Sequence, residues 1–386
     1  MKNQRNAAKP FSKLISFCLI AVLLMQCQPA RSETVVKPKP SKQSIMLALL
    51  LDTSNSMDGL IDQAKSQLWK IVNELAAAKC DDGSKPTIQI ALYEYGNDGL
   101  PELSGYIRQV SPLTDDLDLI SEKLFALKTN GGNEFCGQVI QTSLQQLAWT
   151  SSEADLKMIF IAGNEPFTQG EVPYQTACAL ANEKDVVVNT IYCGNFSEGM
   201  NTDWKKGADL TKGSYMSIDQ DRATVYISTP YDDQIAALND RLNSTYVYYG
   251  KTGNSKKENQ TKQDFNAATY GKGNTVERTI SKSTSAYSNS SWDLVDAAKD
   301  NEAAIEKAPV ETLPAEMKSM TVQQRKDYVK QKSSERTKIQ SDIQKLNSQR
   351  KVYLEQNKQV ETSENSLDGT MIQSIKGQAK TKKLKW

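Results

Sequence analysis

The sequence predicts an α/β protein built on a doubly wound, mainly parallel sheet, extended by a polar α-helical C-terminal region. Three apolar runs of buried-strand type, residues 45–51, 157–163 and 185–194, are separated by segments whose apolar residues recur at helical spacing. Beyond residue 225 the chain becomes rich in lysine, glutamine, asparagine and serine. Because strands that alternate with helices form a parallel sheet covered on both faces, we expect one domain over residues 45–225.

The other elements of this domain follow from local patterns. Residues 87–96 alternate between apolar and polar side chains, as a strand does, and residues 105–111 are typical of a shorter strand beside it. Helices are expected over residues 60–78, 117–127, 138–147, 174–183 and 204–211, and a final strand over residues 213–218.

The first 32 residues are typical of an export signal. Basic residues precede an apolar stretch at residues 14–25, which is too short to span a bilayer comfortably. Two cleavage patterns compete: Ala30 and Ser32 suit an ordinary signal peptidase, whereas residues 24–27 resemble a lipoprotein box with Cys27 as the lipidation candidate. Residues 33–44, rich in proline and lysine, predict a linker. We therefore expect an exported bacterial protein of the periplasm or cell envelope, anchored to the membrane by lipid if Cys27 is modified.

Composition excludes several classes of function. The chain has no histidine, which removes Ser-His and Cys-His catalysis and the usual zinc sites. Its formal charge is +1, so the chain as a whole lacks the basic excess of a nucleic-acid binder. We therefore expect a protein that is not an enzyme and does not bind nucleic acid, and any metal ion would be held by oxygen ligands.

Four cysteines lie beyond the export signal. They are Cys80, Cys136, Cys178 and Cys193. In an oxidising compartment an even number of cysteines predicts disulfides, with three connectivities available. Cys136, Cys178 and Cys193 are expected near one rim of the sheet, which makes a bridge from Cys136 to Cys178 a candidate and Cys193 a rival partner. Buried free thiols remain the alternative.

The C-terminal half is expected to be helical but loosely packed. Residues 226–250 can form a helix, whereas residues 251–291 contain few apolar side chains and predict a flexible polar insertion. Residues 292–386 predict a helical region with a basic tail. Within it a thin seam of Ile339, Ile343, Leu346 and Tyr353 fits either a helix on its own domain or a coiled coil.

Small polar residues come directly after the first apolar strand. Asp52, Ser54 and Ser56 alternate, so their oxygen atoms can point to one place above the carboxyl end of the sheet, where open α/β sheets bind ligands. One carboxylate and two hydroxyls suit a hard divalent cation, Mg²⁺ or else Ca²⁺ or Mn²⁺. The alternative is a helix cap, since Ser, Asn and Asp are favoured at helix N-termini and Asp58 lies at the start of the next helix.

The segment "DTSNS" at residues 52–56 resembles the D-x-S-x-S signature of the von Willebrand factor type A domain. The segments "LKTNGGNEFCGQVI" and "IFIAGNEPF" are similar to the second and third metal loops of that family, and the resemblance covers roughly residues 44–218. It implies a metal-ion-dependent adhesion site in which Asp52 acts through water and Ser54 and Ser56 bind the ion directly.

The second and third loops depart from the family pattern. Asn133 follows the paired glycines where the family usually has threonine, and Gly163 stands where it usually has aspartate. The resemblance therefore implies a partly degenerate site, with Asn133 as a replacement ligand and Glu165 reaching back through a water. Asn164 and Glu134 are candidates for contact with a partner.

The resemblance implies a non-enzymatic, exported binding or adhesion module that captures a protein partner through a divalent cation. A carboxylate of the partner would fill the open position of the ion, and residues 163–174 would set specificity. The alternative is an envelope scaffold whose metal site is degenerate and whose helical C-terminal region makes the partner contacts.

Overall fold

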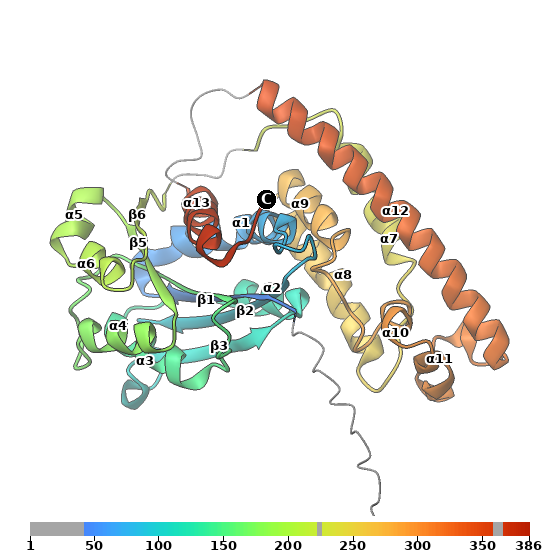
Figure 1. The fold of residues 1–386 in the computed structure, drawn as a ribbon, viewed down its shortest axis with the longest axis horizontal. Helices are drawn as coiled ribbons and strands as arrows, with labels where there is room; N and C mark the ends of the chain where they lie inside the picture. Colours follow the sequence, from blue (N-terminus) through green and yellow to red (C-terminus); the bar gives the residue numbers. More distant parts are fainter. Residues whose placement is uncertain (1–41, 222–225, 358–365) are drawn as a thin grey trace, which may run out of the picture. The chain divides into compact units, whose positions relative to one another are not determined.

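The computed structural model describes residues 42–221, 226–357 and 366–386. The predicted export signal, Cys27 and nearly all of the predicted linker lie outside these residues. The core is a six-stranded sheet in the order β3-β2-β1-β4-β5-β6, in which β3 alone is antiparallel to its neighbour (Figure 1). The predicted fold class, a doubly wound and mainly parallel sheet with a helical C-terminal region, is confirmed.

The strands and helices match the predicted order. The strands are β1 (Ser44–Asp52), β2 (Thr87–Tyr95), β3 (Ile107–Thr114), β4 (Leu156–Gly163), β5 (Val187–Cys193) and β6 (Tyr215–Ile218). The helices of the sheet layers are α1 (Asp58–Ala77), α2 (Leu117–Phe125), α3 (Cys136–Gln146), α4 (Tyr174–Glu183), α5 (Phe196–Asn201), α6 (Trp204–Asp209) and α13 (Leu367–Ala379). The helices between β6 and α13 are α7 (Asp232–Asn243), α8 (Gly253–Thr269), α9 (Lys272–Lys282), α10 (Leu294–Asp300), α11 (Ala303–Lys307) and α12 (Val322–Gln356).

The central strand β1 supplies side chains to a core on each face of the sheet. Leu47, Leu49 and Leu51 pack with α1, α2 and α13, while Ala48 and Leu50 pack with α3 and α4. This division follows from the two-residue period of a strand. The carboxyl ends of β1, β2 and β4 stop at nearly the same level, since Asp52 pairs with Tyr95 and Leu51 with Ala162.

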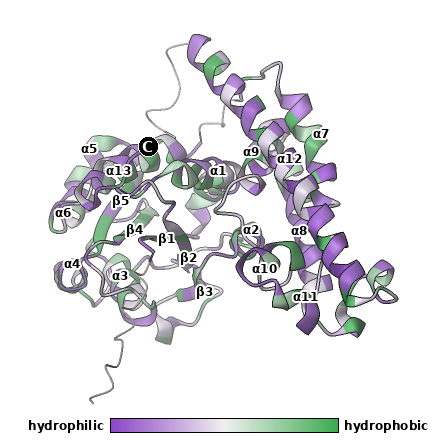
Figure 2. Cartoon of the chain, turned by 45° about the vertical axis from the view of Figure 1, so that its right-hand side comes forward, coloured by the Kyte–Doolittle hydropathy of each residue, from purple (hydrophilic) through white to green (hydrophobic). Residues whose placement is uncertain are grey.

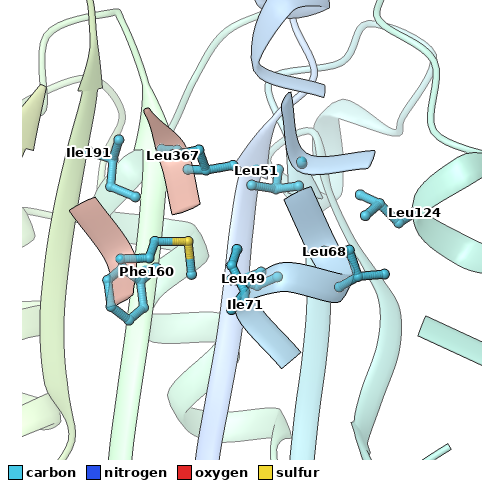
Figure 3. Close-up of a pocket in the computed structure, with 11 residues that line it drawn as sticks. Leu49, Leu51, Leu68, Ile71, Leu124, Phe160, Ile191 and Leu367 are labelled. Carbon is cyan, nitrogen blue, oxygen red and sulfur yellow. The ribbon is translucent and has the colours of Figure 1, made fainter. Parts of the chain in front are cut away.

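The last helix of the sheet layers comes from the C-terminus of the chain. α13 packs against α1, and the two helices and the sheet enclose an apolar cavity to which Leu367 and Met371 of α13 contribute (Figure 3). The α/β layers are therefore completed by residues 367–379, beyond the predicted boundary at residue 225. The predicted basic tail packs on this domain, with Lys385 paired to Asp81 at 2.7 Å and Lys382 to Asp185 at 2.9 Å.

The prediction of a flexible insertion at residues 251–291 is wrong for α8 and α9. These helices are polar along most of their length (Figure 2), but their buried face holds an ionic cluster. Buried Arg278 of α9 pairs with Asp118 of α2 at 2.9 Å and with Asp264 of α8 at 2.5 Å. Buried Lys282 pairs with Asp264 at 3.0 Å. The segment has few apolar side chains to bury. Paired opposite charges hold these helices against the domain instead.

The long helix α12 packs within its own chain. It begins with a capping box between Thr321 and Gln324, and it contacts α7, α9, α10 and α11. Ile339 and Ile343 of the predicted seam are buried in the main core, so the structure corresponds to the predicted alternative of a helix lying on its own domain. Among the described helices, none is long and apolar enough to cross a membrane.

The predicted disulfides are absent, because all four cysteines of the described chain are buried free thiols. Cys136 and Cys178 belong to the core on the α3 and α4 face, and Cys80 and Cys193 to the core on the opposite face. The sheet therefore separates Cys193 from Cys136, although both lie near the same rim. The Cys136 thiol contacts the Tyr95 hydroxyl at 3.8 Å, and the Cys178 thiol contacts the Gly207 carbonyl at 3.4 Å.

Candidate metal centre

The loop after β1 brings Asp52, Ser54 and Ser56 together. The Ser54 amide donates to Asp52 Oδ1 at 2.7 Å, and the Ser54 and Ser56 hydroxyls lie 3.2 Å apart. Neither Ser54 nor Met57, the residues before the short 3₁₀ turn and before α1, caps its helix with a side chain. The helix-cap alternative is therefore wrong, and the serine hydroxyls remain available to a ligand.

A second layer of contacts holds this loop in place. The Thr53 amide donates to the Tyr95 carbonyl at 2.9 Å, and the Asn130 amide donates to the Thr53 carbonyl at 2.9 Å. The Asn97 side chain donates to the Lys128 carbonyl at 3.0 Å. The first and second loops are thus tied to each other and to the end of β2, which orders the oxygen atoms above the sheet.

Glu134 of the second loop is turned inward beside Asp52. Gly96, at φ +76°, shows how close the two side chains are: a Cβ on this glycine would stand 2.6 Å from Glu134 Cγ and 2.8 Å from Asp52 Oδ1. Glu134 is only 5% exposed, and its backbone amide donates to the Gln169 side chain at 3.1 Å. Glu134, predicted as a partner contact, is instead a buried member of the site.

The third loop contributes an amide rather than a carboxylate. Asn164 lies against Ser56, with its Nδ2 atom 3.2 Å from the Ser56 hydroxyl. Glu165 is exposed, and its carboxylate accepts a hydrogen bond from Gln169 at 3.3 Å. A Cβ on Gly163 would stand 2.5 Å from the Tyr95 hydroxyl oxygen. Tyr95 therefore occupies the space in which a side chain at position 163 would lie.

Asn133 is not drawn into the site. Its side chain is exposed, and it forms no hydrogen bond with any residue that the structure describes. The structure therefore gathers Asp52, Ser54, Ser56 and Asn164 with Glu134, places Glu165 at the edge, and leaves Asn133 facing solvent. The position of Glu134 could not be read from residue spacing, because the residue one place earlier fits the family pattern better.

The electrostatics of the site are unbalanced. Burial raises the pKa of the Asp52 carboxyl well above its usual range, and the neighbouring Glu134 raises it further. Burial raises the pKa of Glu134 to about 7, with a further contribution from Glu165. Asp52 Oδ2 and Glu134 Oε2 are both buried without a hydrogen-bond partner. Each of these inward-facing carboxylates therefore has one oxygen to which no described residue donates, and a proton or a cation would stabilise it.

The residues present fit a hard divalent cation. Carboxylate, hydroxyl and amide oxygens are the ligands that Mg²⁺, Ca²⁺ and Mn²⁺ prefer. Among the described residues no three acidic, cysteine or histidine side chains are grouped closely enough to hold a metal ion by themselves. An ion here would therefore need the hydroxyls of Ser54 and Ser56 together with the carboxylates of Asp52 and Glu134.

Exposed apolar side chains lie on the loops around this site. Leu103, in the β2–β3 loop, is fully exposed, and Phe196 of α5, just after β5, is 49% exposed. Acidic residues follow the same rim, including Asp98 and Glu171. Sequence patterns missed these apolar positions, because a single apolar residue in a loop carries no periodicity.

Residues 47–241, just over half of the chain, match the family "von Willebrand factor type A domain", and the chain belongs to this family. A search of curated proteins found no match to the chain. Such domains commonly mediate adhesion between proteins, and they often bind a divalent metal ion.

The chain is also similar to several solved structures, at low sequence identity. The conserved hypothetical protein BatB from Bacteroides thetaiotaomicron is 17% identical with a TM-score of 0.35, and the match covers 46% of this chain and 91% of that one. Proximal thread matrix protein 1 from the mussel byssus, described with a zinc-occupied MIDAS motif, is 15% identical with a TM-score of 0.35; the match covers 47% and 43%. The pilus adhesin SpaC from Lactobacillus rhamnosus GG is 11% identical with a TM-score of 0.34, and the match covers 46% of this chain and 28% of that one.

Proposed function

We propose that this protein is a non-enzymatic binding module that captures a protein partner through a divalent cation held above the sheet. The observation that carries the proposal is the pair of buried carboxylate oxygens, Asp52 Oδ2 and Glu134 Oε2, which no described residue hydrogen-bonds and which lie beside the hydroxyls of Ser54 and Ser56. Leaving buried carboxylates uncompensated is costly. A bound cation would remove that cost and would offer an open coordination position to a carboxylate of the partner.

The residues of the chain define the direction from which a partner approaches. Asp52 and Glu134 close the inner side of the site, whereas Ser56 is exposed and Asn164 is half-buried. A partner carboxylate would therefore enter beside Ser56 and Asn164. Leu103 would supply apolar contact at the rim.

The charge around the opening indicates the chemistry of the partner. The rim carries several acidic side chains, among them Asp98, Glu102, Glu165 and Glu171. A partner surface that is basic and apolar around one acidic residue is complementary to it, because opposite potentials steer association and reject like-charged proteins.

Cation binding is the first test of the proposal. Isothermal titration of the chelator-treated chain with Mg²⁺, Ca²⁺ and Mn²⁺ should show binding to one site, and Asp52→Asn should abolish it. Asn133→Ala is the matched control, since Asn133 faces solvent, and it should bind as the wild type does. Absence of binding of all three ions to the wild type would contradict the proposal.

Partner capture is the second test. Immobilised wild-type chain should retain envelope proteins that are released by EDTA, whereas Asp52→Asn should not retain them, and Leu103→Ser should retain them more weakly. Retention that is equal in the wild type and Asp52→Asn, and insensitive to EDTA, would instead favour the scaffold alternative.

For the scaffold alternative, point variants on the exposed face of α12 are more informative than removal of the C-terminal region. Deletion from residue 320 onwards would remove α13 from the α/β layers and Arg336 from its ion pair with Asp293 at 2.6 Å. Charge reversal at exposed Lys338 and Lys345 leaves these contacts intact. Loss of capture in that double variant would support the scaffold function.

We also propose that the chain is exported to the periplasm or cell envelope. The basic and apolar pattern of residues 1–32 and the linker character of residues 33–44 support this location. Mass spectrometry of the mature N-terminus is the test. A diacylglyceryl group on Cys27 would establish lipid anchoring, and an unmodified N-terminus beyond Ser32 would establish a released form.

A further inference from the structure

We propose that Glu134 is a cation ligand of this site and replaces the carboxylate that the third loop lacks at Gly163. The inference rests on the proposed function, in that it takes the cation site as real, and it assigns the second negative charge to a different loop. Asp52 and Glu134 would then hold the ion from two neighbouring loops, in a ligand set that the spacing of residues did not indicate.

The position of Glu134 is the first support for this assignment. Its Cγ atom and Asp52 Oδ1 lie 2.6 and 2.8 Å from the same point, the place where a Cβ on Gly96 would stand. A side chain on residue 96 would therefore displace both acids, and its positive φ suits glycine. The close approach of two carboxylates is built into the end of β2.

The second support is that one oxygen of each acid has no partner among the described residues. Glu134 Oε2 and Asp52 Oδ2 are buried and accept no hydrogen bond from the described residues. None of the ion pairs among the residues that the structure describes includes either acid; the adjacent Glu94, by contrast, is paired with Arg108. The two acids face each other without a lysine or arginine between them, and one divalent ion would neutralise their two negative charges.

The third loop cannot perform this role. The Tyr95 hydroxyl donates to the Ala162 carbonyl at 3.0 Å and fills the space above Gly163. Glu165 lies outside, where it is exposed and hydrogen-bonded to Gln169. Because Tyr95 excludes a side chain at Gly163, the carboxylate has to come from elsewhere, and Glu134 is the buried acid within reach.

The experiment compares cation affinity in a set of variants of the full mature chain. Glu134→Gln keeps the size of the side chain and removes its charge, and Glu134→Asp keeps the charge on a shorter stem. Glu165→Gln is the matched control, because it removes a charge from the edge of the same site. Mn²⁺ is the probe, and its dissociation constant is measured by calorimetry.

We expect Glu134→Gln to weaken Mn²⁺ binding by about tenfold or more, since charge count sets the affinity of oxygen sites. Glu134→Asp should fall between this variant and the wild type, and Glu165→Gln should change the dissociation constant by less than about threefold. Thermal melting without cation supplies a second readout. There, Glu134→Gln should melt at a higher temperature than the wild type, because it removes repulsion between two buried carboxylates.

Each outcome decides a different statement. Binding to the wild type that is equally strong in Glu134→Gln would overturn the role of Glu134 and leave the proposed cation site standing. A wild type that binds no Mn²⁺ would overturn the proposed function, and the assignment of Glu134 with it. A Glu134→Gln variant that melts below the wild type without cation would also contradict the assignment, because it would show that the charge stabilises the fold by itself.

Discussion

The protein buries carboxylates in two regions, and it treats them in opposite ways. In the helical region Asp264 is held by Arg278 and Lys282 and accepts hydrogen bonds from Asn239 and Asn243. Burial alone would raise the pKa of Asp264, but the charges of Arg278 and Lys282 hold this pKa well below its usual range. At the rim of the sheet, Asp52 has no basic partner, and its pKa is raised.

The difference separates structure from function. A buried acid with its own cations is complete and holds helices together, as Asp118 and Asp264 do with Arg278. A buried acid without a basic partner costs stability until a proton or a cation neutralises its charge. The same chemical group therefore links helices in one region and forms part of the proposed cation site in the other.

Breaking the ionic cluster around Arg278 should have the largest effect on stability. Arg278→Met removes the charge that neutralises Asp118 and Asp264 and the contact of the guanidinium with the Trp69 ring, 4.6 Å from its centroid. We expect the free energy of unfolding to fall by about 3–5 kcal/mol, since removal of one partner leaves buried charges uncompensated. Chemical denaturation measures this change, and a loss below about 1 kcal/mol would show that the cluster does not hold the helices together.

A side chain placed between Asp52 and Glu134 should have the second largest effect on stability. Gly96→Ala places a Cβ against Glu134 and Asp52 at a φ of +76° and should destabilise the chain by about 2–3 kcal/mol and weaken cation binding. Gly83→Ala is a matched control, because its φ is +79° but nothing lies within 4 Å. It should cost only about 1 kcal/mol and leave cation binding unchanged. Equal losses in the two variants would mean that backbone strain alone is responsible.

The pH dependence of the cation-free protein should be smaller and opposite in sign to that of paired acids. Because the folded pKa values of Asp52 and Glu134 are raised, the native state binds more protons than the unfolded state, and stability falls as pH rises from about 4.5 through about 7. After allowance for solvent screening the loss is about 1–2 kcal/mol. Denaturation at several pH values tests this, with the double variant Asp52→Asn, Glu134→Gln as the flat reference. Saturating Mn²⁺ should also reduce the slope.

An exposed ion pair should have the smallest effect. Lys272 pairs with Asp233 at 2.5 Å, but the side chains are 42% and 87% exposed. Lys272→Ala should change the free energy of unfolding by less than about 0.5 kcal/mol, because water and salt screen such pairs. A loss approaching that of Arg278→Met would show that burial does not account for the contrast between the two regions.

The fold of the α/β domain, and the clustering of oxygen atoms in the loop after β1, could be predicted from local patterns. The apolar runs of β1, β4 and β5 and the alternation of β2 are properties of short segments, as is the order of Asp52, Ser54 and Ser56 behind a strand. Local patterns could not show that α8 and α9 fold around a buried ionic cluster, since Asp118 comes from a distant part of the chain. They also could not show that α13 returns to cover α1.

The amino-acid sequence by itself determined which elements form and which oxygen atoms follow the first strand, because periodicity and spacing act within one segment. The tertiary structure alone decided which carboxylate lies beside Asp52. Tyr95 fills the space at Gly163, and Gly96 admits Glu134 beside Asp52. Those choices depend on three strands ending at one level, and steric exclusion between distant segments has no signature in the local pattern of residues.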